Sequence, residues 1–177
     1  MEPSRQRFVI LRAQAGDRAA LDEVLRSVQG ELYGYICRLI GDVHLAEDIL
    51  QETFVVLCRQ LKWLRHPEFF RTWLYRVATR EAMRRIGRER RRRGIPLETI
   101  AEPPSAEPWC ALEPGEIADA LGRIHTLPPN SRAVILLHYC AGLSLSDAAT
   151  AMGVPEGTAK SRLAYGLGLL RKKAGEA

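Results

Sequence analysis

A proline-rich acidic segment near the middle of the chain limits the possible folds more than any other feature. Residues 94–115 contain five of the ten prolines and four acidic side chains, but no lysine or arginine. Proline cannot continue a helix, and the adjacent Pro103 and Pro104 exclude a helix through this segment. We therefore expect residues 94–115 to be an extended acidic linker between two domains, residues 1–93 and residues 116–177.

Apolar residues recur at helical spacing in both flanking parts, and no alternating run is long enough to indicate a strand. Asp17 and Asp42 precede the first two long patterns and are suitable N-cap residues. Ser144, with Asp147 three residues later, resembles a capping box. We expect an all-α protein with an N-terminal helical bundle and a C-terminal helix-turn-helix bundle. The expected helices cover about 19–40, 42–64, 68–93, 116–126, 130–141, 145–152 and 156–173.

The charge and the apolar runs of the chain indicate what kind of partner it binds and where in the cell it is found. The formal net charge is +5, and residues 1–93 alone carry 19 basic and 12 acidic side chains, which favours an anionic partner. The longest apolar runs have about five residues, far fewer than the roughly 20 that cross a membrane. The run Phe8–Leu11 is too short for a signal peptide. We expect a cytoplasmic protein without membrane insertion.

Cysteine and histidine show no spacing typical of a metal or catalytic site. The cysteines stand at positions 37, 58, 110 and 140 and form no CxxC motif. An enzyme built on His44, His66, His125 or His138 would need a second ligand or a paired nucleophile, and the sequence indicates neither. We expect no metal, no cofactor and no enzymatic activity. Buried structural thiols are the preferred interpretation of Cys37 and Cys140, with a regulatory role as the alternative.

Arginines dominate the end of the predicted helix 68–93. Seven arginines and one acid lie between Arg84 and Arg93. Arginine neutralises phosphates, and an aromatic ring stacks on an unpaired base, so this face favours nucleic acid. The alternative is a solvated basic helix end with Trp73 in the core. The expected core face is Phe70, Leu74, Val77, Ala78 and Ala82. The candidate nucleic-acid-binding residues are Trp73, Arg76, Arg80, Arg84, Arg85 and Arg88.

An acidic patch is predicted on the helix that starts at Asp42. Asp48, Gln51, Glu52 and Val55 follow one another at helical spacing on the face opposite the apolar arc. Two acids four residues apart repel each other, so an uncompensated patch beside an exposed valine indicates a basic protein partner. The alternative is that acids early in a helix simply complement its dipole.

The segment from Ser144 to Lys173 has the layout of a helix-turn-helix. A recognition helix places its N-terminal residues against base edges in the major groove, and Arg162 suits a guanine. An ordinary helix pair within a bundle is the alternative. The predicted core face of the last helix is Ala159, Leu163, Leu167 and Leu170. Gly166 and Gly168 are unusual in a helix interior, and they either permit close packing or fray the helix end.

Two motif blocks resemble the extracytoplasmic-function (ECF) sigma factors of bacterial RNA polymerase. The first comprises residues 46–54 (AEDILQETF), residues 70–78 (FRTWLYRVA) and the arginine run, and it is similar to the domain that binds core polymerase and the −10 element. The second comprises Leu127-Pro128-Pro129 with Arg132 and residues 153–163 (GVPEGTAKSRL), and it is similar to the −35-binding domain. The resemblance covers nearly the whole chain.

The resemblance implies a transcription initiation factor that directs core RNA polymerase to promoters and helps to melt them. It assigns polymerase binding to Asp48, Gln51, Glu52 and Val55, and the −10 element to the tryptophan and arginines of helix 68–93. It assigns the −35 element to the C-terminal domain, and it implies an anti-sigma protein as a further partner. The implied −35 contacts are Arg132, Thr158, Lys160, Ser161, Arg162 and Tyr165.

The competing hypothesis is a free-standing helix-turn-helix transcriptional regulator that never contacts polymerase. Such a protein would use the C-terminal domain but would have no use for the patch of Asp48, Gln51 and Glu52.

Overall fold

The computed structural model describes residues 3–92, 94 and 121–174, and within these ranges every regular element is a helix or a helical turn. The all-α prediction is confirmed for this part of the chain. The predicted linker, Gly94 apart, and residues 116–120 of the predicted helix 116–126 lie outside the described residues.

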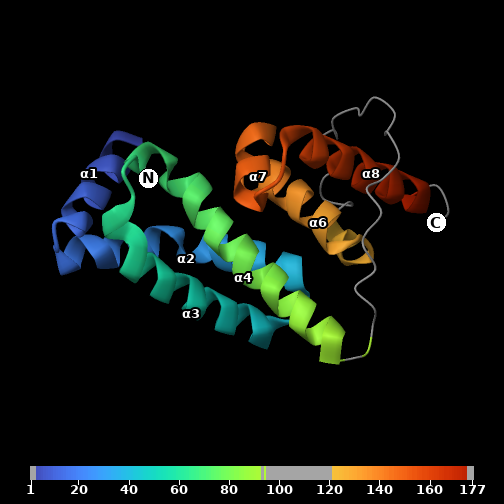
Figure 1. Ribbon diagram of the computed structural model, residues 1–177, viewed down its shortest axis with the longest axis horizontal. Coiled ribbons are helices and arrows are strands. Elements are labelled where there is room, and N and C mark those ends of the chain that lie inside the picture. Colours follow the sequence, from blue (N-terminus) through green and yellow to red (C-terminus); the bar gives the residue numbers. More distant parts are fainter. Residues whose placement is uncertain (1–2, 93, 95–120, 175–177) are drawn as a thin grey trace.

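The N-terminal part is a bundle of four helices (Figure 1). It consists of α1 (Pro3–Gln14), α2 (Arg18–Ile40), α3 (Val43–Gln60) and α4 (Phe70–Arg92), with 3-10 turns at Leu61–Trp63 and Pro67–Phe69 between α3 and α4. Helix α1 was not predicted from the sequence.

The first two predicted N-caps are confirmed. Asp17 accepts a hydrogen bond from the Ala20 amide at 3.1 Å, and Asp42 accepts one from the Leu45 amide at 3.0 Å. This bond from the Ala20 amide, together with the Arg12 side chain, lowers the pKa of Asp17. The caps satisfy amides that have no partner inside the helix, so they set where α2 and α3 begin.

The core face of α4 largely follows its predicted pattern. Four of the five expected residues are buried, whereas Val77 is only half-buried, so that prediction was wrong for Val77. The helix also buries a polar pair that periodicity did not indicate: the hydroxyls of Tyr35 and Thr79 lie 2.7 Å apart. Burial raises the pKa of Tyr35, so the pair is neutral and adds a specific contact between α2 and α4.

The C-terminal part is built around α8 (Glu156–Ala174). It also contains a 3-10 turn (Ile124–Thr126), α6 (Pro129–Ile135), a π-helical turn (Leu136–Cys140) and α7 (Leu145–Met152). Ser144 caps α7 by accepting a hydrogen bond from the Asp147 amide at 3.0 Å, as predicted. Gly153 ends α7 with a φ of 67°, and the pair α7–α8 forms the predicted helix-turn-helix.

The two glycines of α8 have different surroundings. The predicted core residues Ala159, Leu163, Leu167 and Leu170 are all buried. A Cβ at Gly166 would lie 3.1 Å from Ser131 Cβ and 2.8 Å from Ile135 Cδ1, whereas one at Gly168 would meet nothing within 4 Å. Gly166 therefore permits the close packing of α6 against α8, and Gly168 does not serve this purpose.

Alanine at these two positions is expected to change stability in opposite directions. Overpacking by Gly166→Ala costs about 1–3 kcal/mol, which outweighs the roughly 1 kcal/mol gained from helix propensity. Gly168→Ala meets open space and is expected to stabilise the protein by up to about 1 kcal/mol. Urea unfolding of both variants measures the difference, and equal midpoints would contradict this account.

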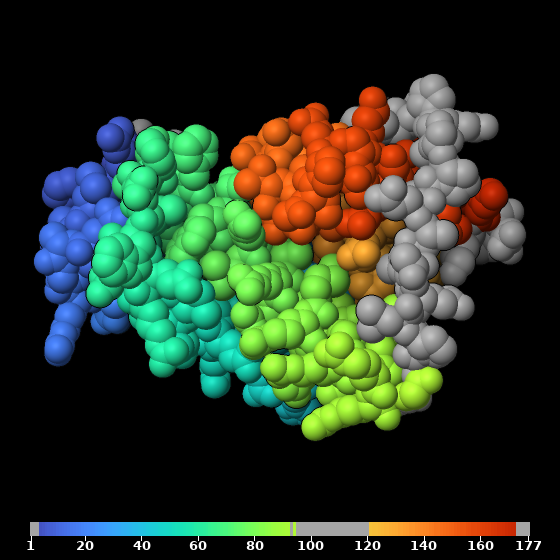
Figure 2. All heavy atoms as spheres, in the orientation of Figure 1, coloured from blue at the N-terminus to red at the C-terminus, as the bar shows by residue number. Residues whose placement is uncertain are grey.

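The N-terminal and C-terminal parts pack against each other (Figure 1). Helix α7 lies beside α4, and the Thr72 hydroxyl of α4 donates to an Asp147 carboxylate oxygen of α7 at 3.2 Å. In the space-filling view the two parts form one continuous body (Figure 2). The sequence indicated two domains but did not indicate that they would be in contact.

Candidate nucleic-acid interface

The four residues of the acidic patch on α3 are exposed together. Asp48, Gln51, Glu52 and Val55 all point to the surface, and Val55 is 46% exposed. They lie on one face because they are three or four residues apart in the helix, while Ile49, Leu50, Thr53 and Leu57 are buried on the other side. The structure thus brings the predicted set onto one surface.

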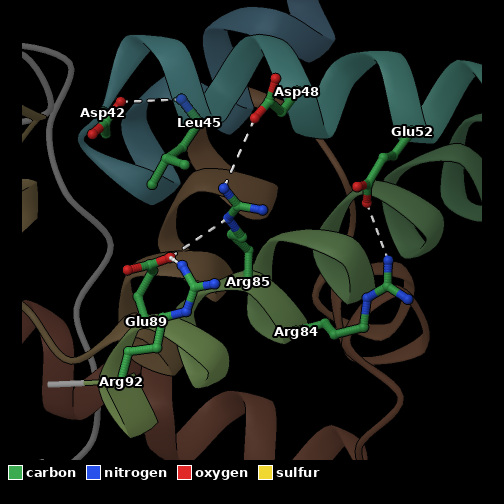
Figure 3. A network of polar contacts seen from close by, with 8 residues as sticks. All are labelled: Asp42, Leu45, Asp48, Glu52, Arg84, Arg85, Glu89 and Arg92. Carbon is green, nitrogen blue, oxygen red and sulfur yellow. Dashed lines mark hydrogen bonds and ion pairs between the residues drawn. The ribbon is translucent and has the colours of Figure 1, made fainter.

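The acids are not uncompensated, which corrects one premise of the sequence analysis. Glu52 accepts a hydrogen bond from Arg84 at 3.1 Å, and Asp48 lies 3.8 Å from the guanidinium of Arg85 (Figure 3). Arg84 also pairs with Glu81. These pairs join α3 to α4, so two of the predicted DNA-binding arginines contact the predicted polymerase-binding acids. Because the pairs are exposed, each contributes only about 0–1 kcal/mol.

The acidic patch lines one hollow and borders a second. A groove of about 660 Å³ between α2 and α3 is lined by Tyr33, Leu50 and Phe54 among others, and it shares Gln51 with the patch. A second hollow of about 450 Å³ lies between α3 and α4, and it is lined by all four patch residues together with Arg84 of α4. The patch is therefore bordered by concave and partly apolar surface, a property that sequence spacing does not reveal.

Helix α4 presents several of its arginines to the surface. Arg76, Arg80 and Arg88 are exposed, whereas Trp73 is half-buried and packs against Phe70 with ring centroids 6.1 Å apart. The Trp73 ring therefore contacts the core and still reaches the surface, and its role toward nucleic acid stays a prediction. The exposed guanidiniums thus place positive charge along the surface of α4.

The predicted contacts on α8 lie on its surface near the start of the helix. Lys160 and Tyr165 are exposed, and Thr158, Ser161 and Arg162 are half-buried. Ser161 donates its hydroxyl to the Gly157 carbonyl at 2.9 Å, which holds the side chain close to the helix. The face opposite is the buried row that packs on α6 and α7.

Arg132 differs from the other predicted −35 contacts because it is only 8% exposed. Its guanidinium donates to the carbonyls of Leu39 at 2.7 Å, His125 at 2.9 Å and Leu127 at 2.9 Å. Burial, with Arg132 nearby, lowers the pKa of His125. The side chain is turned inward in this structure, and contact with DNA would require it to leave these carbonyls.

The remaining predictions concern metal ligands, membrane-spanning helices and the cysteines. Across the residues that the structure describes, no group of three metal-ligating side chains is found. None of the described helices is long and apolar enough to cross a membrane. Cys37, Cys58 and Cys140 are free thiols, and Cys37 and Cys140 are not fully buried, so the preferred interpretation of these two as buried thiols was wrong.

Family models match both parts of the chain. The model described as Sigma-70 region 2 matches residues 24–92, which covers most of α2 and all of α3 and α4. The model described as Sigma-70, region 4 matches residues 117–170, which includes α6, α7 and most of α8.

Curated relatives and solved structures agree with these matches. The chain is 35% identical to ECF RNA polymerase sigma factor SigL of Mycobacterium tuberculosis, covering 89% of this chain and 92% of that protein. It is 33% identical to ECF RNA polymerase sigma factor SigE of Mycolicibacterium smegmatis, covering 88% of this chain but 63% of that protein. The fold is similar to that of CnrH, solved in complex with the cytosolic domain of CnrY, with a TM-score of 0.68, 19% identity and 97% of each chain covered. The chain therefore belongs to the ECF sigma factors, the initiation factors that bind bacterial RNA polymerase and direct it to promoters.

Proposed function

We propose that the chain divides its work as an initiation factor among three surfaces, on α3, α4 and α8. The observation that supports this division is their contrast in charge: an exposed acidic patch lies on α3, while exposed basic side chains lie on α4 and α8. An acidic surface on a DNA-binding protein repels phosphates, so it suits a protein partner. The division uses every site residue predicted from the sequence except Arg132, which lies on α6 and is buried.

The acidic patch of α3 is proposed to bind core polymerase. Its exposed carboxylates attract a basic helix, and Val55 supplies an apolar contact beside them. The groove that shares Gln51 extends this surface toward Tyr33 and Phe54, where an apolar side chain of the polymerase fits. Polymerase binding at Asp48 and Glu52 competes with their pairing to Arg85 and Arg84.

Helix α4 is proposed to hold the −10 element and to assist melting. The exposed Arg76, Arg80 and Arg88 neutralise phosphates. The surface edge of Trp73 offers a ring on which an unpaired base stacks. Arg84 and Arg85 join this surface when a partner takes over the carboxylates that they contact.

Helix α8 is proposed to read the −35 element in the major groove. Its first two turns carry the polar residues, which is the part of a recognition helix that meets base edges. Arg162 is assigned to a guanine, and Thr158, Lys160, Ser161 and Tyr165 to phosphates or neighbouring bases. Arg132 joins them after it leaves its buried position.

Arg162→Ala is expected to weaken binding to the −35 element by about 1–3 kcal/mol and to relax selectivity at one base pair. The loss arises because a bidentate contact to a base edge is removed. Polymerase-bound protein is titrated with duplexes that carry the matched element or single-base changes. Lys172→Ala, which removes a charge from the exposed far end of the same helix, serves as the control. Equal selectivity in the two variants would contradict the assignment.

The proposed cellular location and the proposed anti-sigma partner are based on family membership. Because the chain acts with RNA polymerase, we place it in the cytoplasm. We also propose that an anti-sigma protein regulates it. ECF sigma factors are initiation factors rather than catalysts, and we assign no reaction to the chain itself.

In vitro transcription tests the proposed function. The purified chain is added to core polymerase with a library of promoter templates, and the transcripts are sequenced at their 5′ ends. Starts at a shared −10 and −35 pattern that depend on the chain are expected. A chain that binds DNA alone and selects no start site would overturn the proposal in favour of the free-standing regulator.

A further inference from the structure

We propose that the hollow between α3 and α4 binds one cationic side chain of core polymerase, and that Arg84 occupies this position in the free chain as a competitor. Glu81, which is not among the site residues predicted from the sequence, is then a further polymerase-binding residue. The inference rests on the proposed function in taking the acidic patch as the polymerase surface. It adds the chemistry of the group that this surface recognises.

The hollow combines an apolar wall with carboxylates from two helices. Helix α3 lines it with the four patch residues and Val56, whereas α4 contributes Glu81 and Arg84. Val55 and Val56 suit the aliphatic stem of a lysine or arginine, and the carboxylates suit its charged head. Three acids around one concave surface repel a phosphate. The hollow therefore fits a basic protein side chain rather than DNA.

Arg84 shows which kind of group the hollow accepts. Its guanidinium reaches from α4 to α3, where it donates to Glu52 at 3.1 Å (Figure 3). It also forms an ion pair with Glu81, three residues earlier on α4. The Glu81 side chain is only 12% exposed and the Glu52 side chain 48%, so Glu81 forms the inner part of the hollow and Glu52 its rim. A guanidinium thus already bridges two carboxylates here, in a way that suits its planar set of donors.

The Glu81 carboxylate is incompletely satisfied by Arg84. Its Oε2 atom is buried, and no residue that the structure describes donates a hydrogen bond to it, although the guanidinium lies against it. A buried carboxylate oxygen without a well-aligned donor costs free energy. Glu81 therefore gains from a partner side chain that supplies such a donor, which favours the exchange of Arg84 for a polymerase cation.

Arg84 is able to leave the hollow. Its side chain is 48% exposed, and exposed ion pairs are weak because water and salt compete for the charges. A partner cation and Arg84 cannot both pair with the same two carboxylates. The pairs of Arg84 must therefore be broken first, so Arg84 lowers the affinity of the chain for polymerase. A purely structural role for Arg84 would predict no such effect.

Removing Arg84 is expected to tighten polymerase binding. In Arg84→Gln the pairs with Glu52 and Glu81 need not be broken, and we expect core polymerase to bind about fivefold more tightly. Labelled chain is titrated with core polymerase in the absence of DNA. Arg91→Gln removes the same charge at an exposed arginine of α4 outside the hollow, and it is expected to bind within about twofold of the wild-type chain because distant charges are screened. Equal affinities of the two variants would refute the proposal.

A second substitution tests Glu81 where no competitor is present. Within Arg84→Gln, the change Glu81→Gln removes the charge that the polymerase cation contacts but keeps the shape of the side chain. We expect the double variant to lose the gain in affinity. Glu23→Gln in the same background is the control, since Glu23 is an ion-paired glutamate of α2 outside the hollow. If Glu81→Gln changes the affinity no more than Glu23→Gln does, Glu81 does not bind polymerase and the proposal is wrong.

Arg84→Lys keeps the test decisive if Arg84→Gln loses its fold, which thermal unfolding followed by circular dichroism reports. Lysine retains the positive charge, but its ammonium does not bridge two carboxylates as a guanidinium does. A folded Arg84→Lys chain is expected to bind polymerase about two- to threefold more tightly than the wild-type chain. An affinity no higher than that of the wild-type chain would rule out competition by Arg84.

The wild-type chain separates this inference from the proposed function. If it binds core polymerase and selects start sites while Arg84→Gln and Arg91→Gln are equivalent, only the competition by Arg84 is wrong. If the wild-type chain does not bind polymerase, the acidic patch is not a polymerase surface, and both the proposed function and this inference are wrong.

Discussion

Reversing the charge of Asp48 and Glu52 together is expected to reduce the affinity for core RNA polymerase by roughly 100-fold or more. The double variant Asp48→Arg/Glu52→Arg removes two exposed carboxylates and sets positive charge against a basic partner, where a close charge pair contributes about 1.5 kcal/mol or more. The new arginines also lie beside Arg84 and Arg85, which now contact the native acids. Titration of labelled protein with core polymerase measures the effect.

The control for this experiment changes the net charge equally at other sites. Glu23 and Glu68 are acids outside the patch, and Glu23→Arg/Glu68→Arg is expected to bind polymerase within a few-fold of the wild-type chain. Comparable losses in both double variants would show that overall charge, rather than the α3 patch, governs binding. Undiminished binding by Asp48→Arg/Glu52→Arg would contradict the assignment of the patch.

Reversing the charge of Arg76 and Arg80 is expected to reduce open-complex formation by roughly 100-fold at low salt. Both side chains are exposed on α4, and Arg76→Glu/Arg80→Glu replaces two phosphate contacts by repulsion. The salt dependence of binding is expected to fall by about 1.5 in log–log slope, because fewer counterions are released. Permanganate reactivity of the −10 region reports melting, and affinity over a range of salt concentrations reports the slope.

Arg18 and Arg59 provide matched controls, because both are exposed arginines outside α4. Arg18→Glu/Arg59→Glu has the same net charge as the α4 variant and is expected to melt promoters nearly as well as the wild-type chain. If the α4 variant still forms open complexes and its salt slope is unaltered, α4 does not hold the −10 element. Core-polymerase binding by both variants is measured in parallel to separate the two surfaces.

Local signals predicted much of the fold. Asp17, Asp42 and Ser144 were identified as caps because a capping side chain bonds an amide only three residues away. The buried row of α8 was identified because helical periodicity repeats within a few residues. Helix α1 was missed, since its apolar residues Val9 and Ile10 are buried beside exposed Phe8 and Leu11, and a short apolar run like this carries no clear period.

Long-range contacts account for the rest of the site. The acidic patch was predicted residue by residue, but its pairing with Arg84 depends on a partner 32 positions away. Arg132 was identified as a site residue, but its burial depends on the Leu39 carbonyl, 93 positions away. Contacts between residues so far apart in the sequence produce no periodic pattern, so the sequence does not predict them.

The sequence by itself determined where the main helices begin, which faces they bury and which family the chain resembles, because these properties depend on neighbouring residues. Tertiary structure alone decided that the acids of α3 contact the arginines of α4, that Gly166 lets α6 approach α8, and that the two parts close on Arg132. Each of these features is a contact between helices that are far apart in the sequence. Only the packed chain brings such helices together, so neighbouring residues carry no signal of the contact.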